Sequence, residues 1–112
     1  MSESLVFDLK AAMDRVDNDK ELLRELVQMM TDQYPLQIGE IEGALKANNA
    51  QALGSFSHAI KSALGNLGAM RCYDLALALE KLGKSGSTAG AEKLLAELKA
   101  EFESFKSEAG KL

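Results

Sequence analysis

The 112-residue sequence has few of the residue types on which many protein functions depend. Its single cysteine, Cys72, excludes an internal disulfide and fits a reducing compartment. One cysteine and one histidine are too few for a structural zinc site. No stretch approaches the roughly 20 uninterrupted apolar residues of a membrane helix, and residues 1–5 lack the basic and apolar segments of a secretory signal. We therefore expect a cytoplasmic protein that does not enter membranes.

Positive charge is also scarce, because the formal net charge is −4. Without a basic stripe, the chain is not expected to bind nucleic acid. No acidic cluster surrounds His58, the only histidine, so we expect no metal ion and no cofactor on the chain itself. Residues 78–85 fit a loose form of the phosphate-binding loop, but they close an amphipathic helix instead of following a strand. Nucleotide binding is therefore not expected.

Apolar residues make up 46% of the chain, and they recur with a helical period. The pattern predicts helices over residues 7–16, 19–47, 50–67 and 70–84, and a fifth helix after the turn-rich segment 83–90. Short connections between long amphipathic helices predict an all-α fold, an antiparallel up-down four-helix bundle with a short additional N-terminal helix. We expect residues 1–112 to form one such domain and to be monomeric, because no second large apolar face is predicted.

The ends of the predicted helices carry their own signals. Asn18, followed by Glu21 three residues later, is typical of a capping box that begins the second helix. Asn48 and Asn49 are expected to cap the third. Pro35 is expected to kink the second helix, because proline removes a backbone donor and crowds the preceding turn.

The third predicted helix carries the most informative pattern. Its apolar arc, which should face the core, consists of Leu53, Phe56, Ile60, Leu64 and Leu67. At roughly 100° per residue, His58 lies about 160° from the centre of that arc and should face solvent. Small residues surround it: Gly54, Ser55, Ser62 and Gly65. Because glycine is unfavourable inside a helix, we interpret them as an open surface for a partner protein. The alternatives are an ordinary solvated histidine and small residues that admit a neighbouring helix.

The segment from His58 to Ala69 reads HAIKSALGNLGA, which resembles the signature of histidine-containing phosphotransfer (HPt) domains. Residues 7–9 resemble the first helix of that family, and residues 34–35 resemble the proline position of its long second helix. Leu79 and Glu80 resemble the Leu-Glu pair of the helix that follows the histidine. Ser62 differs from the signature, in which many members have glycine, but it is also small.

The resemblance implies a phosphocarrier of a two-component multistep phosphorelay, which accepts and donates a phosphoryl group on Nε2 of His58. It implies that Lys61 lies beside the phosphoryl oxygens and that Glu80 hydrogen-bonds the other imidazole nitrogen. A solvated Lys61, and a surface salt bridge between Glu80 and Lys84, are the alternatives. Such a carrier is not an enzyme with its own kinase or ATP site.

The partners implied by the resemblance are response-regulator receiver domains, which would supply the divalent metal (Mg²⁺), and a hybrid sensor histidine kinase. Two other functions stay open: a helical adaptor that is never phosphorylated, and a domain excised from a hybrid kinase.

Exposed apolar residues are the candidates for docking a receiver domain. Leu9 and Met13 of the first predicted helix and Leu36 of the second could form this surface. Leu22 and Met29 share the seven-residue spacing of Leu36, but we expect the first helix to pack over these two residues.

Overall fold

The computed structural model describes residues 4–112, which form five helices and no strand. These helices are α1 (Leu9–Arg15), α2 (Lys20–Lys46), α3 (Ala50–Asn66), α4 (Met70–Lys84) and α5 (Ala91–Ala109). The all-α prediction is confirmed. None of the five helices is long and apolar enough to cross a membrane. The prediction made for residues 1–5 falls in part on residues 1–3, which lie outside the described residues.

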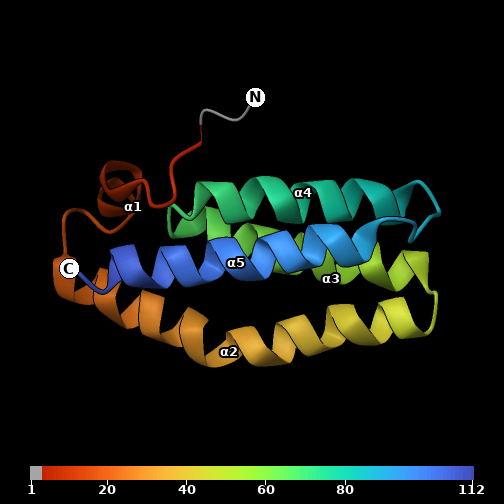
Figure 1. The fold of residues 1–112 in the computed structure, drawn as a ribbon. Coiled ribbons are helices and arrows are strands. Elements are labelled where there is room, and N and C mark those ends of the chain that lie inside the picture. The colour runs from red at the N-terminus through yellow and green to blue at the C-terminus, as the bar shows by residue number, and fades with distance from the viewer. Residues whose placement is uncertain (1–3) are drawn as a thin grey trace.

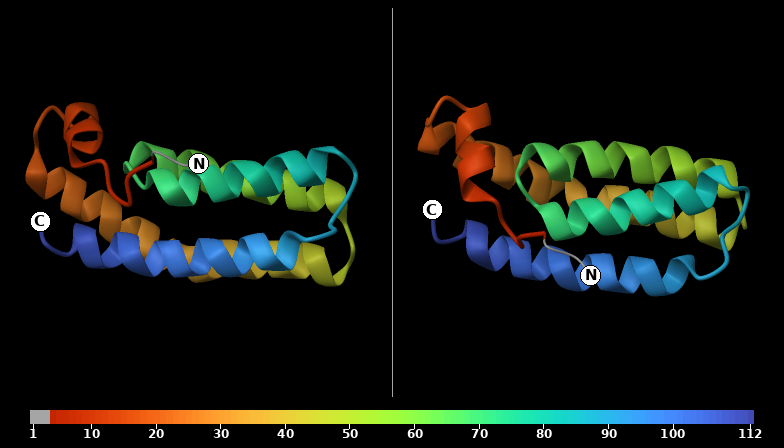
Figure 2. Two further views of the ribbon diagram at one scale, coloured as in Figure 1. Left: turned by 45° about the horizontal axis from the view of Figure 1, so that its top comes forward. Right: turned by 90° about the horizontal axis from the view of Figure 1, so that it is seen from above.

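The four long helices lie side by side, and each runs opposite to the helix before it (Figure 1, Figure 2). Helices α3 and α4 make the most extensive contact, and α2 packs against both α3 and α5. Helix α1 lies across the end of this group at which α2 begins (Figure 1). This arrangement places the third helix, which carries His58, between α2 and α4.

The core consists of the apolar stripes that the helical period predicts. Its largest buried side chains are Leu23, Ile41, Leu53, Ile60, Leu64, Cys72, Leu79, Leu98, Phe102 and Phe105. The ring of Phe102 stacks on that of Tyr34, with 3.7 Å between centroids, and so joins α5 to α2. Burial raises the pKa of the Cys72 thiol to about 12, so this thiol stays protonated at neutral pH.

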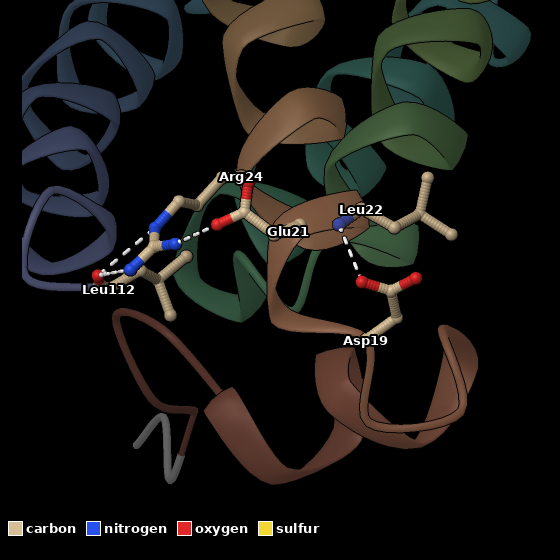
Figure 3. Close-up of polar contacts among 5 residues, drawn as sticks. All are labelled: Asp19, Glu21, Leu22, Arg24 and Leu112. Carbon is tan, nitrogen blue, oxygen red and sulfur yellow. Dashed lines mark hydrogen bonds and ion pairs between the residues drawn. The ribbon is translucent and has the colours of Figure 1, made fainter.

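Helix α2 begins one residue later than predicted (Figure 3). Asp19 is its N-cap, and the carboxylate accepts a hydrogen bond from the backbone nitrogen of Leu22 at 3.0 Å. Asn18 lies in the turn before the helix with a φ of 63°, and Glu21 pairs with Arg24 instead of capping (Figure 3). The Asn18–Glu21 capping box is therefore wrong, because the adjacent aspartate is an equally good cap residue.

The predicted cap of α3 and the predicted proline kink of α2 agree with the structure. Asn49 caps α3, and its side chain accepts a hydrogen bond from the backbone nitrogen of Ala52 at 3.0 Å. Asn48 precedes it in a left-handed conformation, with a φ of 53°. Pro35 lies inside α2, and the ribbon of this helix changes direction near its middle (Figure 1).

Helix α1 does not cover the outer stripe of α2. Leu22 and Met29 are exposed, Met29 by 54% of its surface, so the expected packing over them is wrong. Helix α1 has only seven residues and buries Ala12. The backbone nitrogen of Asp8, its N-cap, donates to the carbonyl of Gly68 at 2.7 Å, which directs α1 toward the α3–α4 turn.

The three candidate docking residues differ in exposure. Leu36 is 71% exposed and Leu9 is also exposed, whereas Met13 is half-buried against the core. Leu36 and Leu9 therefore present apolar surface, and Met13 presents less.

Candidate functional site

His58 and Glu80 face each other across the contact between α3 and α4. The side chain of His58 is 59% exposed, as expected from its position on the helix, whereas that of Glu80 is only 3% exposed. Nδ1 of the imidazole lies 2.7 Å from Oε2 of Glu80. The structure thus brings together an accessible ring and a buried carboxylate.

Glu80 is surrounded by cationic groups. Its Oε1 lies 2.7 Å from Nζ of Lys61, and its Oε2 lies 2.9 Å from Nζ of Lys84. The close contacts with Lys61 and Lys84 and, to a smaller extent, the hydrogen bond from His58 outweigh burial and lower the pKa of Glu80 to about 2. Glu80 is therefore a buried anion at neutral pH, and its contact with Lys84 is only one part of a larger cluster.

The charge of Glu80 selects the tautomer of His58. An ionised carboxylate can only accept hydrogen bonds, so Nδ1 must carry the proton that it donates to Oε2. In the neutral ring the other nitrogen, Nε2, then has a free lone pair. Because the ring is exposed, this lone pair is available to a group brought by another molecule.

Lys61 is not an ordinary solvated lysine. Its side chain is only 16% exposed, and its ammonium group lies 6.0 Å from the centre of the Tyr73 ring. The lysine therefore lies between Glu80 and Tyr73, one helical turn beyond His58.

The four small residues around His58 fall into two kinds. Ser55 and Ser62 are exposed, as an open surface requires. Gly54 is buried against α4. A Cβ atom added to Gly83 of α4 would lie 2.8 Å from the Cα atom of Gly54. Gly65 contacts α4 as well, since a Cβ atom there would lie 2.9 Å from Cδ2 of Tyr73.

The prediction that all four small residues form an open surface is therefore wrong for Gly54 and Gly65. These two glycines admit the neighbouring helix, which was the alternative. The apolar arc of α3 can still be buried, because a helix in such a bundle touches two neighbours, and its contact surface is wider than its apolar stripe.

Four residues that line the cavity beside the histidine were not predicted to belong to the site: Gln51, Gly83, Lys84 and Gly86. The cavity has a volume of about 590 Å³ and is also lined by Gly54, Ser55 and His58. Lys84 could have been found, because it lies four residues after Glu80 on the same helix face. Within residues 4–112, no group of three histidine, cysteine or acidic side chains is placed to hold a metal ion.

The fold and the site define a class of protein: a small helical domain that presents one accessible histidine beside a buried carboxylate. A family model described as Hpt domain matches residues 25–108, so the chain belongs to the Hpt domain family. The fold is similar to the crystal structure of histidine-containing phosphotransfer protein B (HptB) from Pseudomonas aeruginosa PAO1. The TM-score is 0.83 at 22% identity, over 96% of each chain. None of the curated proteins compared with the chain matches it.

Hpt domains are carriers in two-component phosphorelays, in which they work with receiver domains and histidine kinases and have no kinase activity of their own. Membership in this family makes the chain a phosphocarrier and does not favour the adaptor alternative.

Proposed function

We propose that His58 carries the phosphoryl group, on Nε2. The observation that supports this assignment is the 2.7 Å contact between Nδ1 of the exposed imidazole and the buried carboxylate of Glu80. A neutral imidazole nitrogen is a competent nucleophile near neutral pH, whereas a serine hydroxyl needs an activating base. Ser55 and Ser62, the nearest exposed hydroxyl residues of α3, have no such base among their hydrogen-bond partners.

The transfer proceeds in both directions by displacement at phosphorus. The lone pair of Nε2 forms a bond to phosphorus, the bond from phosphorus to the receiver's aspartate breaks, and the aspartate leaves as a carboxylate. Nδ1 keeps its proton, and Glu80 balances the positive charge that develops on the ring. Lys61 adds positive charge one turn away, and Mg²⁺ and most of the remaining stabilisation come from the receiver domain.

The receiver domain approaches over the outer side of α3. The short side chains of Ser55 and Ser62 leave room for the receiver domain on this side. The exposed Leu9 and Leu36 offer apolar contacts, and the half-buried Met13 offers a smaller one. The proposal also includes a hybrid sensor histidine kinase as donor and a cytoplasmic location. It further includes a monomeric single domain over residues 1–112, built as a four-helix bundle with an additional N-terminal helix.

The variant His58→Gln tests the assignment. After incubation with a phosphorylated receiver domain, the wild-type protein should acquire a label that is labile in acid and stable in base, and the variant should acquire none. His58 is exposed, so its replacement should change stability by less than about 0.5 kcal/mol, and circular dichroism should show an unchanged helix content. A labelled, folded His58→Gln variant would place the phosphoryl group on another residue and refute the assignment.

A further inference from the structure

Lys84, the last residue of α4, contacts the same carboxylate oxygen as the imidazole ring and lines the same cavity. Its Nζ lies 2.9 Å from Oε2 of Glu80, and the same oxygen accepts the hydrogen bond from Nδ1 of His58. Two donors that share one oxygen lie close to each other. The ammonium group of Lys84 is therefore linked through this oxygen to the imidazole ring that we propose to carry the phosphoryl group.

The side chain of Lys84 reaches this position over Gly54. A Cβ atom added to Gly54 would lie 3.4 Å from the backbone nitrogen of Lys84 and 3.6 Å from its Cγ. The first part of the lysine side chain thus packs against α3 at a residue without a side chain. Lys84, Gly54 and His58 line the same cavity, so the stem has open space beside it.

Lys61 and Lys84 both pair with Glu80, but their surroundings differ. Lys61 is 16% exposed, and its ammonium group is enclosed between Oε1 of Glu80 and the ring of Tyr73. Lys84 is 68% exposed and contacts the oxygen on the histidine side. A lysine ammonium has three donors on a flexible stem, so Lys84 can turn toward a new anion while Lys61 stays in place.

We propose that Lys84 is a second cation for the phosphoryl group. When Nε2 of His58 is phosphorylated, Nζ of Lys84 donates a hydrogen bond to a phosphoryl oxygen, and Lys61 remains on Oε1 of Glu80. Charge-assisted hydrogen bonds to phosphoryl oxygens are strong, and Glu80 keeps two other donors when Lys84 turns away. Lys84 forms no covalent bond and transfers no proton. The inference rests on the proposed function, because it requires a phosphoryl group on His58.

A neighbouring cation has a measurable effect on the phosphoryl group itself. It favours the dianion over the monoanion and so lowers the pKa of the phosphoryl group. The ³¹P resonance of the phosphorylated protein reports this ionisation when the pH is varied. The experiment uses the full chain, phosphorylated with phosphoramidate, so that no receiver domain is involved.

Three variants isolate the charge of Lys84. Lys84→Met keeps the length of the stem and removes the charge, and it should raise the pH midpoint of the ³¹P resonance by roughly half a pH unit or more. Lys84→Arg keeps the charge and should stay close to wild type. Lys81→Met is the matched control, since Lys81 is an exposed lysine one turn earlier on α4, and it should leave the midpoint unchanged.

A second measurement needs only the wild-type protein. The ammonium resonance of Lys84 should shift on phosphorylation, and that of Lys81 should not. The proposal is overturned if Lys84→Met has the wild-type midpoint, or if the ammonium resonance of Lys84 does not respond. If the wild-type protein gives no phosphohistidine resonance with either phosphoramidate or a phosphorylated receiver, the proposed function itself fails.

Discussion

The two sides of α3 that flank His58 use small residues for different purposes. On the side toward α4, Gly54 meets Gly83 backbone to backbone, and Gly65 accommodates the ring of Tyr73. On the outer side, Ser55 and Ser62 are exposed. The glycines determine how closely α4 approaches, whereas the serines leave room for a partner.

This difference explains how Glu80 reaches His58. Gly83 follows Glu80 by three residues, and Gly54 precedes His58 by four, so the close contact lies about one turn from the carboxylate–imidazole pair. A small residue near a functional side chain can thus act by positioning a neighbouring helix as well as by clearing space.

The largest effect is expected from Gly83→Ala, which disrupts the side toward α4. The added Cβ would lie 2.7 Å from the carbonyl oxygen of Ala50 and 2.8 Å from Cα of Gly54. Backbone atoms cannot give way locally, so α3 and α4 must separate. We expect a loss of about 1–3 kcal/mol in the free energy of unfolding. Because a misplacement of ~1 Å can cost on the order of a hundredfold in rate, we also expect slower phosphoryl acceptance.

Urea denaturation and the rate of labelling measure both effects. Gly39→Ala is the control, because nothing lies within 4 Å of a Cβ atom at Gly39, and this change in α2 should stabilise the protein by about 0.5–1 kcal/mol. If Gly83→Ala behaves like Gly39→Ala, the close approach of α3 and α4 does not position Glu80.

The outer side is tested by Ser62, one turn from His58. Ser62→Tyr should stay folded and lose transfer on the order of a hundredfold, because its side chain stands between the reacting groups. Ser62→Gly should keep the rate or raise it slightly, although it lowers helix propensity by about half a kcal/mol. Transfer from a phosphorylated receiver is measured together with the receiver's affinity. Wild-type transfer by Ser62→Tyr would mean that the outer side need not be open.

A smaller effect is expected from Gly65→Ala, at the other end of the α3–α4 contact. The nearest atom to the added Cβ is Cδ2 of Tyr73 at 2.9 Å, which belongs to a side chain that can shift. The gain in helix propensity, about 1 kcal/mol, offsets much of the strain. Urea denaturation should therefore show a smaller loss than for Gly83→Ala, with transfer retained. If Gly65→Ala and Gly83→Ala lowered the free energy of unfolding equally, the two ends of the α3–α4 contact would not differ as we propose.

A separate effect is expected in the pH dependence of stability. The pKa of Glu80 is lowered to about 2 in the folded protein, mainly by Lys61 and Lys84. A carboxylate with a lowered pKa contributes stability above its unfolded value of about 4.3, and this contribution is lost as the pH falls through the folded value. Between pH 5 and 2, Glu80→Gln should therefore lose less stability than the wild type in urea denaturation. Parallel profiles would show that Glu80 is not the ionised centre of the cluster.

The sequence was sufficient to predict most of the fold. Apolar periodicity located all five helices, and the Asn49 cap and the orientation of His58 followed from local geometry. The start of α2 was missed because Asn18 and Asp19 are both good cap residues, and only the turn conformation decides between them. The direction of α1 depends on the hydrogen bond between Asp8 and Gly68, which no periodic pattern reveals.

The site was predictable as far as a single helix and a family motif allow. The motif named His58, Lys61 and Glu80, and the structure places all three in one cluster. The contacts of Gly54 with Gly83 and with Lys84 lie between α3 and α4. These contacts depend on how α3 is shifted along α4. The periodicity of a single helix gives no information about that shift.

The burial of Cys72 has a practical consequence for following these events in solution. Its thiol is 1% exposed and has a pKa near 12, and alkylating reagents react with the thiolate. The native chain should therefore resist maleimide without any need to replace this cysteine. A cysteine introduced at the exposed position of Lys81 on α4 would be the one reactive thiol on the molecule. A fluorophore attached there could report the arrival of a receiver domain in real time.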